Sequence, residues 1–402
     1  MSNQRQGLLT LNAGSSSIKF AVFTVPELKQ LLIGQIDSIG SIAAFKAKSS
    51  DALINEKYEW SQQDAPQNHA DALKWLIEWL NLRMANLKIC AVGHRVVHGG
   101  QFYSEPVLIN DDVLHQLESL LALAPLHEPH NVAGIKAARE SFGEIAQVAC
   151  FDTAFHRDQP FINDTFAIPR HFYEEGVRRY GFHGLSYEYI SKNLPELFPE
   201  HAKGRVIILH LGNGASMCAI KDGRAVSSTM GFSALDGLAM GTRCGNIDPG
   251  VLLYLMEFKG MKAKEISDLL YKESGLKGLS GISNDMRTLE GSDQPEAKEA
   301  IDYFVSRVKR EIGSLAMALG GLDAMVFTGG IGENSVNVRK AVLEGCEWLG
   351  VEIDEANNAS GQTVISSEFS SVLCLRIPTN EEGMIAAHTL ALSNLSIPTM
   401  SS

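Results

Sequence analysis

Leu8-Leu-Thr-Leu-Asn-Ala-Gly-Ser-Ser-Ser-Ile-Lys-Phe-Ala-Val22 consists of an apolar run, a turn of glycine and serine, and a second apolar run. This order predicts a strand, a tight turn and another strand. The stretch Val206-Ile-Ile-Leu-His-Leu-Gly-Asn-Gly-Ala-Ser-Met-Cys-Ala-Ile220 has the same plan, and its Gly212 falls opposite Gly14. The two stretches agree in pattern and not in identity, so by itself this agreement only hints at an internal duplication.

Strand-like and helix-like segments alternate along the rest of the chain, which predicts an α/β fold. Further strands are expected at Val148–Phe151 and Ala324–Thr328, and helices at Asp71–Leu87, from Asn110 to Leu123, at Pro295–Leu319 and at Glu381–Leu392. Asn110 is a good N-cap, and the glycine pair at 320–321 stops the long helix before it. Residues 329–332 are expected to form a turn, with Glu333 and Asn334 capping the next helix.

Length and charge bound the class of protein. The 402 residues are close to three times a usual ~150-residue domain, so we expect two domains. Lys plus Arg number 35 against 47 Asp plus Glu, a net charge of −12, which argues against a nucleic-acid binder or a binder of anionic membranes. No apolar run approaches the ~18–20 residues that cross a bilayer. The polar start, Met1–Gly7, predicts no secretory signal.

The cysteines and histidines do not form a metal pattern. The six cysteines are scattered without a C-x-x-C pair, which predicts reduced thiols and a cytoplasmic location. His94 and His98 have a spacing that suits zinc on a helix, but the valines and glycines around them favour a strand. Pro129 and the order of residues at His127–His130 exclude an H-E-x-x-H helix, so a zinc hydrolase is disfavoured.

Three glycine-rich turns follow apolar strands, at residues 12–19, 212–216 and 329–334. Glycine lets backbone N–H groups turn toward an anion, and serine hydroxyls and Lys19 add donors. One such turn alone is more often an ordinary hairpin, but three favour a nucleoside polyphosphate site. None is a Walker A or Rossmann sequence, so we expect hairpins, and not chiefly a helix N-terminus, to hold the phosphates.

Two arginines lie between glycines in Val92-Gly-His-Arg-Val-Val-His-Gly-Gly100 and Met240-Gly-Thr-Arg-Cys-Gly245. Arg95 either holds a small carboxylate through its planar fork or forms a structural pair with an aspartate. Arg243 could stabilise charge on a transferring phosphoryl group. Asp152, at the end of a strand, is a metal or water anchor or a helix cap. His183 donates to a phosphoryl oxygen or caps a turn.

Leu9-Thr-Leu-Asn-Ala-Gly-Ser-Ser-Ser-Ile-Lys19 and the stretch around Arg95 resemble the two signature motifs of the acetate kinase family. Seven further blocks resemble family blocks in the same order: 123–127, 151–156, 210–214, 240–245, 280–287, 327–334 and 378–382. The resemblance spans residues 8 to about 390. It implies an α/β fold of two duplicated ribonuclease H-like (actin-like ATPase) domains around an interdomain cleft. The domains would be residues 1–152 plus 382–402, and residues 153–381.

The resemblance also implies an activity and its partners. The enzyme would transfer a phosphoryl group reversibly from ATP to acetate, giving acetyl phosphate and ADP, with Mg²⁺, for which Mn²⁺ can substitute. It would be a homodimer. Two other classes stay open: an ATP-gated binding or regulatory protein of the same fold, and a phosphatase or nucleotide hydrolase.

Site residues carry over by motif. Arg95 would bind the carboxylate, with Val97, Leu126 and Phe182 around the methyl group, and Asp152, His183 and Arg243 would be catalytic. Asn12 and Glu381 would sit at the metal. The nucleotide would contact Lys19, His210, Leu211, Gly212, Asn213, Gly214, Asp285, Met286, Arg287, Gly330, Ile331, Gly332, Glu333 and Asn334.

Three positions depart from the family pattern. Tyr187 stands where many members have a second histidine, and its hydroxyl could take over an orienting hydrogen bond. Ala234 replaces a proline of the acetate pocket and could admit propionate, since one methylene discriminates by only ~1–3 kcal/mol, whereas Val97 favours acetate. Glu128 stands where asparagine is common, with an effect left open.

Overall fold

The protein is described by a computed structural model for residues 5–14, 16–121 and 127–395. By its internal contacts the chain divides into two compact units, unit 1 (Met1–Ala154 and Asn380–Ser402) and unit 2 (Phe155–Thr379). The domain boundaries expected from the sequence, after residues 152 and 381, lie near these divisions and stay a prediction. The α/β class is confirmed, because each unit contains a sheet with helices.

Unit 1 is built on an eight-stranded sheet of order β5-β4-β3-β2-β1-β6-β8-β7. Its strands are β1 (Arg5–Ala13), β2 (Ile18–Thr24), β3 (Gln30–Asp37), β4 (Ala44–Ser49), β5 (Asn55–Glu59), β6 (Leu87–Val96), β7 (Val107–Leu108) and β8 (Ala146–Phe151). Strands β1 to β5 pair antiparallel in succession, whereas β1, β6 and β8 are parallel. The carboxyl ends of these three strands therefore lie at one edge of the sheet.

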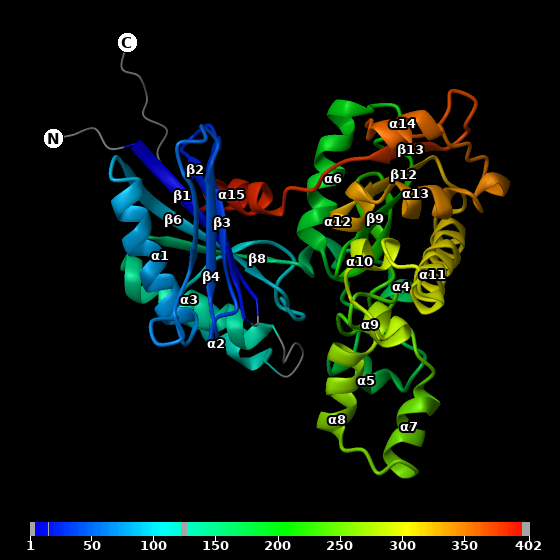
Figure 1. Cartoon of the computed structure of the whole chain (residues 1–402), viewed down its shortest axis with the longest axis horizontal. Coiled ribbons are helices and arrows are strands. Elements are labelled where there is room, and N and C mark those ends of the chain that lie inside the picture. Colours follow the sequence, from blue (N-terminus) through cyan, green and yellow to red (C-terminus); the bar gives the residue numbers. More distant parts are fainter. Residues whose placement is uncertain (1–4, 15, 122–126, 396–402) are drawn as a thin grey trace. The chain divides into compact units, whose positions relative to one another are not determined.

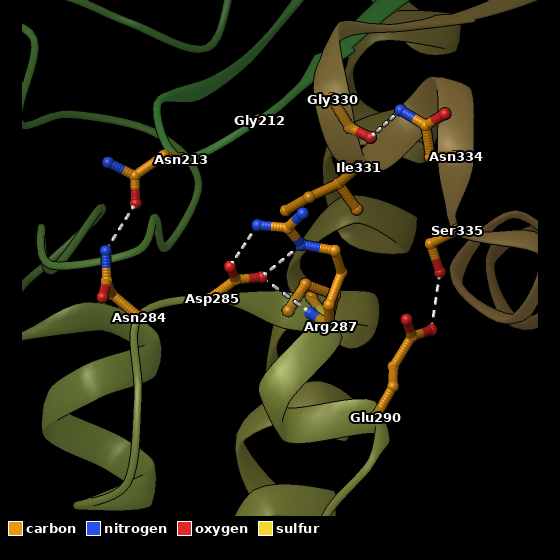
Figure 2. A pocket seen from close by; sticks show the side chains of 11 residues that line it. Gly212, Asn213, Asn284, Asp285, Arg287, Glu290, Gly330, Ile331, Asn334 and Ser335 are labelled. Atoms are coloured by element: carbon orange, nitrogen blue, oxygen red, sulfur yellow. Dashed lines mark hydrogen bonds and ion pairs between the residues drawn. The ribbon is translucent and has the colours of Figure 1, made fainter. Parts of the chain in front are cut away.

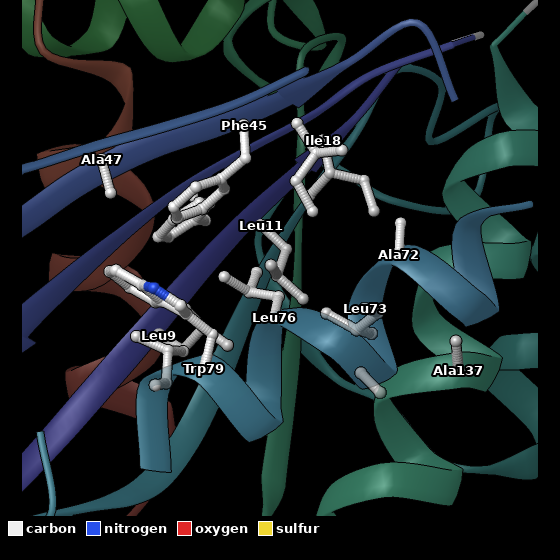
Figure 3. Packing of buried hydrophobic residues seen from close by; sticks show 14 of the residues in the cluster. Leu9, Leu11, Ile18, Phe45, Ala47, Ala72, Leu73, Leu76, Trp79 and Ala137 are labelled. Carbon is white, nitrogen blue, oxygen red and sulfur yellow. The ribbon is translucent and has the colours of Figure 1, made fainter. Parts of the chain in front are cut away.

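Helices cover both faces of this sheet (Figure 1). They are α1 (His69–Arg83), α2 (Asp111–Ser119), α3 (Glu128–Phe142) and α15 (Glu381–Leu392). Leu9 and Leu11 of β1 pack toward α1 and α3, in a cluster that also contains Phe45 and Trp79 (Figure 3). Leu8 instead packs with Ala386 of α15. This alternation along β1 is the period of two that a strand imposes on its side chains.

Unit 2 has a five-stranded sheet of order β11-β10-β9-β12-β13. The strands are β9 (Arg205–Leu211), β10 (Ala215–Lys221), β11 (Arg224–Ser228), β12 (Ala324–Thr328) and β13 (Leu373–Arg376). The helical segments are α4 (Phe161–Asp164), α5 (Arg170–Glu174), α6 (Gly184–Leu197), α7 (Pro249–Glu257), α8 (Ala263–Asp268), α9 (Gly275–Ser280), α10 (Met286–Glu290), α11 (Pro295–Leu319), α12 (Gly329–Asn334), α13 (Val336–Leu343) and α14 (Glu355–Ser360), with the short turns η1 (Ala154–His156), η2 (Leu269–Glu273) and η3 (Glu347–Leu349).

The two sheets share a topology. In β3-β2-β1-β6-β8 and in β11-β10-β9-β12-β13, the first three strands are antiparallel and the last two run parallel to the third. The strand–turn–strand stretches at 8–22 and 206–220 occupy the same two places in each sheet, as β1–β2 and β9–β10. The duplication that their patterns hinted at is thus confirmed at the level of topology.

Three elements match the predicted bounds, and other predicted segments do not. The structure has the helix Pro295–Leu319, the strand Ala324–Thr328 and the helix Glu381–Leu392 as predicted. The helix predicted at Asp71–Leu87 is His69–Arg83, because Leu87 already begins β6. The helix predicted from Asn110 to Leu123 is Asp111–Ser119 with Asn110 as its N-cap, and Leu123 lies outside the described residues. The predicted turn at 329–332 is wrong, because these residues begin α12, and Ser335 rather than Glu333 or Asn334 caps the next helix. Local glycine content suggested a turn, but Glu333 accepts hydrogen bonds from Gly329 and Thr379 and so fixes this segment as a helix.

Two further expectations can be checked over the same residues. The six cysteines are free thiols, four of them buried, with Cys90 and Cys244 half-buried. None of the helices within residues 5–14, 16–121 and 127–395 combines the length and apolar composition needed to cross a bilayer.

The C-terminal helix α15 packs closely on β6 because Gly93 has no side chain. A Cβ atom at Gly93 would lie 2.6 Å from the Ile385 Cγ2 atom, and closer still to the Thr389 hydroxyl. Both neighbours belong to α15, whose first residues are Glu381 and Glu382. Gly93 therefore sets how near the start of α15 lies to the carboxyl end of β6.

We predict that Gly93→Ala lowers the free energy of unfolding by about 1–3 kcal/mol, the usual cost of overpacking a core. Denaturant unfolding would measure it. Gly313→Ala is the control, because a Cβ there meets nothing within 4 Å and alanine favours a helix interior by up to ~1 kcal/mol. Equal stabilities for the Gly93 variant and the wild type would contradict the prediction.

Candidate active site

Unit 1 brings three predicted site residues together at the carboxyl ends of its parallel strands. Arg95 is the penultimate residue of β6, and Asp152 directly follows β8. The Arg95 Nε atom lies 3.1 Å from each Asp152 carboxylate oxygen, and Nη2 donates to Oδ2 at 2.6 Å. Nη1 also donates to Asn12 Oδ1 of β1 at 3.4 Å. Ligand sites in α/β sheets form at this edge.

The charges around Arg95 are dominated by carboxylates. Burial disfavours the charged guanidinium, but Asp152, Glu381 and Glu382 together raise the pKa of Arg95, so it stays a cation. Burial, and then Glu381, raise the pKa of Asp152 against the opposing effect of Arg95. Burial and Glu381 likewise raise the pKa of Glu382, while Lys19 lowers it. Three acids thus share two cationic side chains.

This excess of negative charge suits a divalent cation. Asn12 and Glu381 supply an amide and a carboxylate oxygen, which are ligands that Mg²⁺ prefers. Among the described residues no group of three or more His, Cys, Asp or Glu side chains forms a metal cage. Mg²⁺ usually keeps several waters and binds one or two protein oxygens plus substrate phosphates, so the residues present fit it.

The residues predicted for the apolar pocket belong to different units of the chain. Val97 is buried just after β6, and its backbone N–H donates to Asn131 Oδ1 at 2.9 Å. Asn131 Nδ2 in turn donates to the carbonyl oxygen of Ala13, at 2.9 Å, and so ties α3 to β1. Phe182 is buried in unit 2, and Leu126 lies outside the described residues.

In unit 2, His183 and Arg243 both lie beside Gly214, in the glycine turn between β9 and β10. A Cβ atom on Gly214 would lie 3.2 Å from His183 Nε2 and 4.0 Å from Arg243 Nη1. His183 has a left-handed backbone with φ of +56°, unusual for a residue with a side chain, and such strain gathers at functional sites. A side chain at Gly214 would therefore crowd the His183 ring and contact Arg243.

The loop that carries Arg243 is fixed to the same turn. Gly241 N–H donates to the carbonyl oxygen of Asn213 at 2.9 Å. A Cβ atom on Gly241 would overlap the Asn213 amide. Arg243 Nη1 also donates to the carbonyl oxygen of Ala234 at 3.2 Å. The guanidinium is thus held in place by its own unit.

A cavity of about 720 Å³ opens beside this turn (Figure 2). Its size is that of a small-molecule or cofactor site. Asn284 donates to Asn213 Oδ1 at 3.1 Å, and Ser335 donates to Glu290 Oε1 at 2.6 Å across its wall. The lining residues are Gly212, Asn213, Asn284, Asp285, Met286, Arg287, Glu290, Gly330, Ile331, Asn334 and Ser335.

Eight of the predicted nucleotide residues line this cavity, and the others lie elsewhere. His210, Leu211, Gly214, Gly332 and Glu333 are not among the lining residues, and Lys19 belongs to unit 1. Asn284, Glu290 and Ser335 were missed by sequence reasoning. Asn284 lies inside the block 280–287, which resembles a family block, so the sequence could have pointed to it. Nothing in the sequence links Glu290 to Ser335, which are joined by a hydrogen bond between the end of α10 and the residue that caps α13.

Glu128, at the start of α3, is fully buried. Among the described residues its carboxylate oxygens make no hydrogen bond of normal geometry, although the His98 backbone lies close enough to act on them. Burial raises the pKa of Glu128 from 4.5 to about 8, although the His98 backbone opposes this. The folded chain therefore holds a proton here that the unfolded chain releases above its ordinary pKa, so this residue makes the fold less stable as pH rises from about 4.5 to about 8.

We predict that Glu128→Gln, which stays neutral, removes this loss of stability. Denaturant unfolding at about pH 5 and about pH 8 would measure it, since the linkage acts between these values. Glu140→Gln, an exposed position on the same helix, is the matched control. An unchanged pH dependence in Glu128→Gln would contradict the prediction.

Known proteins resemble this chain over nearly its whole length. The profile of the Acetokinase family matches residues 7–387. The acetate kinase of Methylocella silvestris is 58% identical over 394 residues, covering 96% of this chain and 97% of that protein. A crystal structure of a propionate kinase from Francisella tularensis has 38% identity and a TM-score of 0.90, covering 96% of this chain and 100% of that one. The acetate kinase of Porphyromonas gingivalis has 37% identity and a TM-score of 0.87, covering 96% and 99%. The chain therefore belongs to the acetokinase family.

Proposed function

We propose that this enzyme transfers a phosphoryl group reversibly from ATP to acetate, giving acetyl phosphate and ADP. The observation that carries the proposal is the partly buried Arg95–Asp152 pair at the carboxyl ends of β6 and β8, with Asn12 beside it. The 58% identity to an acetate kinase supports the same choice of substrate. An ATP-gated binding protein or a hydrolase of this fold would not need a carboxylate-binding arginine.

The groups of unit 1 would hold the acceptor. A carboxylate is already ionised and nucleophilic near neutral pH, so the enzyme mainly has to bring two anions together against their repulsion. Arg95 has a planar fork that suits the acetate carboxylate, and buried Val97 offers apolar surface to the methyl group. Asp152 would orient Arg95 and the attacking carboxylate, without acting as a strong base.

The groups of unit 2 would hold the donor. Asn213 and Asn284 offer amides, and Ile331 and Met286 offer apolar surface, in a cavity large enough for a nucleotide. The backbone at Gly212–Gly214 can approach phosphates closely. His183 and Arg243, at the same turn, would stabilise the charge that spreads over the transferring phosphoryl group.

Mg²⁺, for which Mn²⁺ can substitute, is the proposed metal, with Asn12 and Glu381 as its protein ligands. It would neutralise phosphate charge during transfer. Arg95 and Lys19 cannot do this alone, because Asp152, Glu381 and Glu382 already surround them.

Propionate is the second candidate acceptor. The Francisella tularensis propionate kinase has a TM-score of 0.90 to this chain, and Ala234 leaves space where a proline is common. Val97 and the higher identity to an acetate kinase favour acetate. Since one methylene changes binding by only ~1–3 kcal/mol, we expect propionate to react with lower efficiency.

We predict acyl phosphate formation that depends on acetate. ADP release and hydroxylamine trapping would be measured with acetate, with propionate and without acceptor. If hydroxylamine traps no more acyl phosphate with acetate than in the control without acceptor, the proposal is refuted. ADP release in the absence of any acceptor would indicate a hydrolase. A higher kcat/KM for propionate would make the second candidate the function.

We predict that variants of Arg95 and Arg243 distinguish binding of the acetate carboxylate from stabilisation of the transferring phosphoryl group. Arg95→Ala should raise the KM for acetate far more than the KM for ATP. Arg243→Ala should lower kcat by about 10²- to 10³-fold, as the loss of one charge-stabilising donor does, with ATP binding kept. Arg83→Ala, which breaks an exposed ion pair with Glu56, is the control. Equal effects of Arg95→Ala on both KM values would contradict a carboxylate role.

We further propose a homodimer and a cytoplasmic location. Helix α7 has no buried residue although it is mostly apolar, and Leu253 and Tyr254 are 57% and 48% exposed. An exposed apolar helix of this kind suits a second copy of the chain.

Six free thiols are typical of a reducing compartment.

We predict twice the 43.8 kDa chain mass in sedimentation equilibrium. Leu253→Asp should yield the monomer, because it places a charge on the apolar face of α7. Leu197→Asp, at an exposed leucine of α6, should leave the dimer intact. A monomeric wild type would contradict the dimer, and a dimeric Leu253→Asp would move the interface away from α7.

A further inference from the structure

A serine hydroxyl joins His183 to Tyr187. Ser216 Oγ lies 2.7 Å from His183 Nδ1 and is also hydrogen-bonded to the Tyr187 hydroxyl. Ser216 and Tyr187 are both fully buried, and His183 is 9% exposed. The three side chains come from β10, from α6 and from the residue that caps α6. The contact thus depends on the packing of α6 on the sheet.

The imidazole of His210 lies against the imidazole of His183 and is also hydrogen-bonded to a serine. His210 stacks on His183 with ring centroids 4.3 Å apart, and its own Nδ1 lies 2.8 Å from Ser186 Oγ. Ser216 stands opposite His210 in the β9–β10 register, so both side chains lie on one face of the sheet. The stacked ring fixes the plane of His183, and the serine fixes its rotation within that plane.

Two arrangements of protons satisfy these hydrogen bonds, because the serine proton can point either at His183 Nδ1 or at the Tyr187 hydroxyl. A neutral imidazole carries one N–H, at either Nδ1 or Nε2, and the partner of the other nitrogen decides which. If the Tyr187 hydroxyl donates to Ser216, the serine proton is free to point at His183 Nδ1. Nδ1 is then an acceptor, and the imidazole proton lies on Nε2, the ring atom nearest to Gly214 of the glycine turn.

We propose that Tyr187 and Ser216 are positioning residues that hold His183 in its Nε2–H form. The ring then donates a hydrogen bond from Nε2 toward the place where, on the proposed function, the transferring phosphoryl oxygens arrive. Neither Tyr187 nor Ser216 touches the substrate in this scheme. They act only through His183, and no proton moves along the chain of hydrogen bonds from Tyr187 through Ser216 to His183 during the reaction.

The first test reads the ring directly and does not depend on catalysis. In protein labelled with ¹⁵N-histidine, long-range ¹H–¹⁵N spectra distinguish a protonated from an unprotonated ring nitrogen, and His183→Gln identifies the signal. We expect His183 to carry its proton on Nε2, and Ser216→Ala to turn this single state into a mixture. Ser228→Ala, which removes a buried hydroxyl bonded to a backbone carbonyl of the same sheet, should change nothing.

The second test is kinetic. Tyr187→Phe and Ser216→Ala should lower kcat on the order of 10- to 100-fold, as the loss of groups that orient a functional histidine does, with the KM values for ATP and acetate little changed. Tyr180→Phe, which removes another buried tyrosine hydroxyl of unit 2, is the control. Adding Ser216→Ala to His183→Gln should cause no further loss, because the serine then has no ring to orient.

Either of two results would overturn the proposal. One is a wild-type His183 protonated on Nδ1 or on both nitrogens. The other is a ring state that stays the same in Ser216→Ala. A wild type that forms no acyl phosphate would refute the proposed function instead, and the spectra would still decide the state of the ring.

Discussion

Arg95, which is partly buried, and the fully buried Asp152 form an ion pair at the edge where three parallel strands of unit 1 end. Removing Arg95 would leave the buried Asp152 carboxylate without its cationic partner. A pair that only stabilised the fold would gain nothing from further acids. Yet α15 adds Glu381 and Glu382, whose charges act on the same guanidinium. The surplus of negative charge is the feature that makes this edge suited to a divalent cation.

The return of the chain to unit 1 supplies that surplus. After unit 2 the chain re-enters unit 1 at Asn380 and starts α15, with the Asn380 side chain accepting a hydrogen bond from Gly383 N–H at 2.9 Å. Gly93 then lets α15 lie against β6 without a side chain between them. The metal ligand proposed at Glu381 therefore depends on a glycine almost 290 positions earlier in the sequence (381 − 93 = 288).

The repeated topology explains why both units place predicted site residues after the strand that begins their strand–turn–strand stretch. In unit 1 the turn after β1 follows Asn12, and in unit 2 the turn after β9 carries Asn213 and Gly214. The copies have diverged in what surrounds the turn. In unit 1 the neighbours are Arg95 and acids, whereas in unit 2 they are two stacked imidazoles, each bonded to a serine hydroxyl.

The sequence by itself determined the two strand–turn–strand stretches, the strand Ala324–Thr328, the helix Pro295–Leu319 and the family, because these depend on local patterns such as the glycine turn after Leu11 and the stop at Gly320. It also pointed to Arg95 and Asp152 separately. Only the tertiary structure decided that these two are bonded to each other, that Gly329–Asn334 is helical, and that Glu290 and Ser335 share a wall. It likewise decided that Tyr187 reaches His183 through Ser216. Each of these depends on contacts between segments far apart in the chain, and no local pattern encodes such distances.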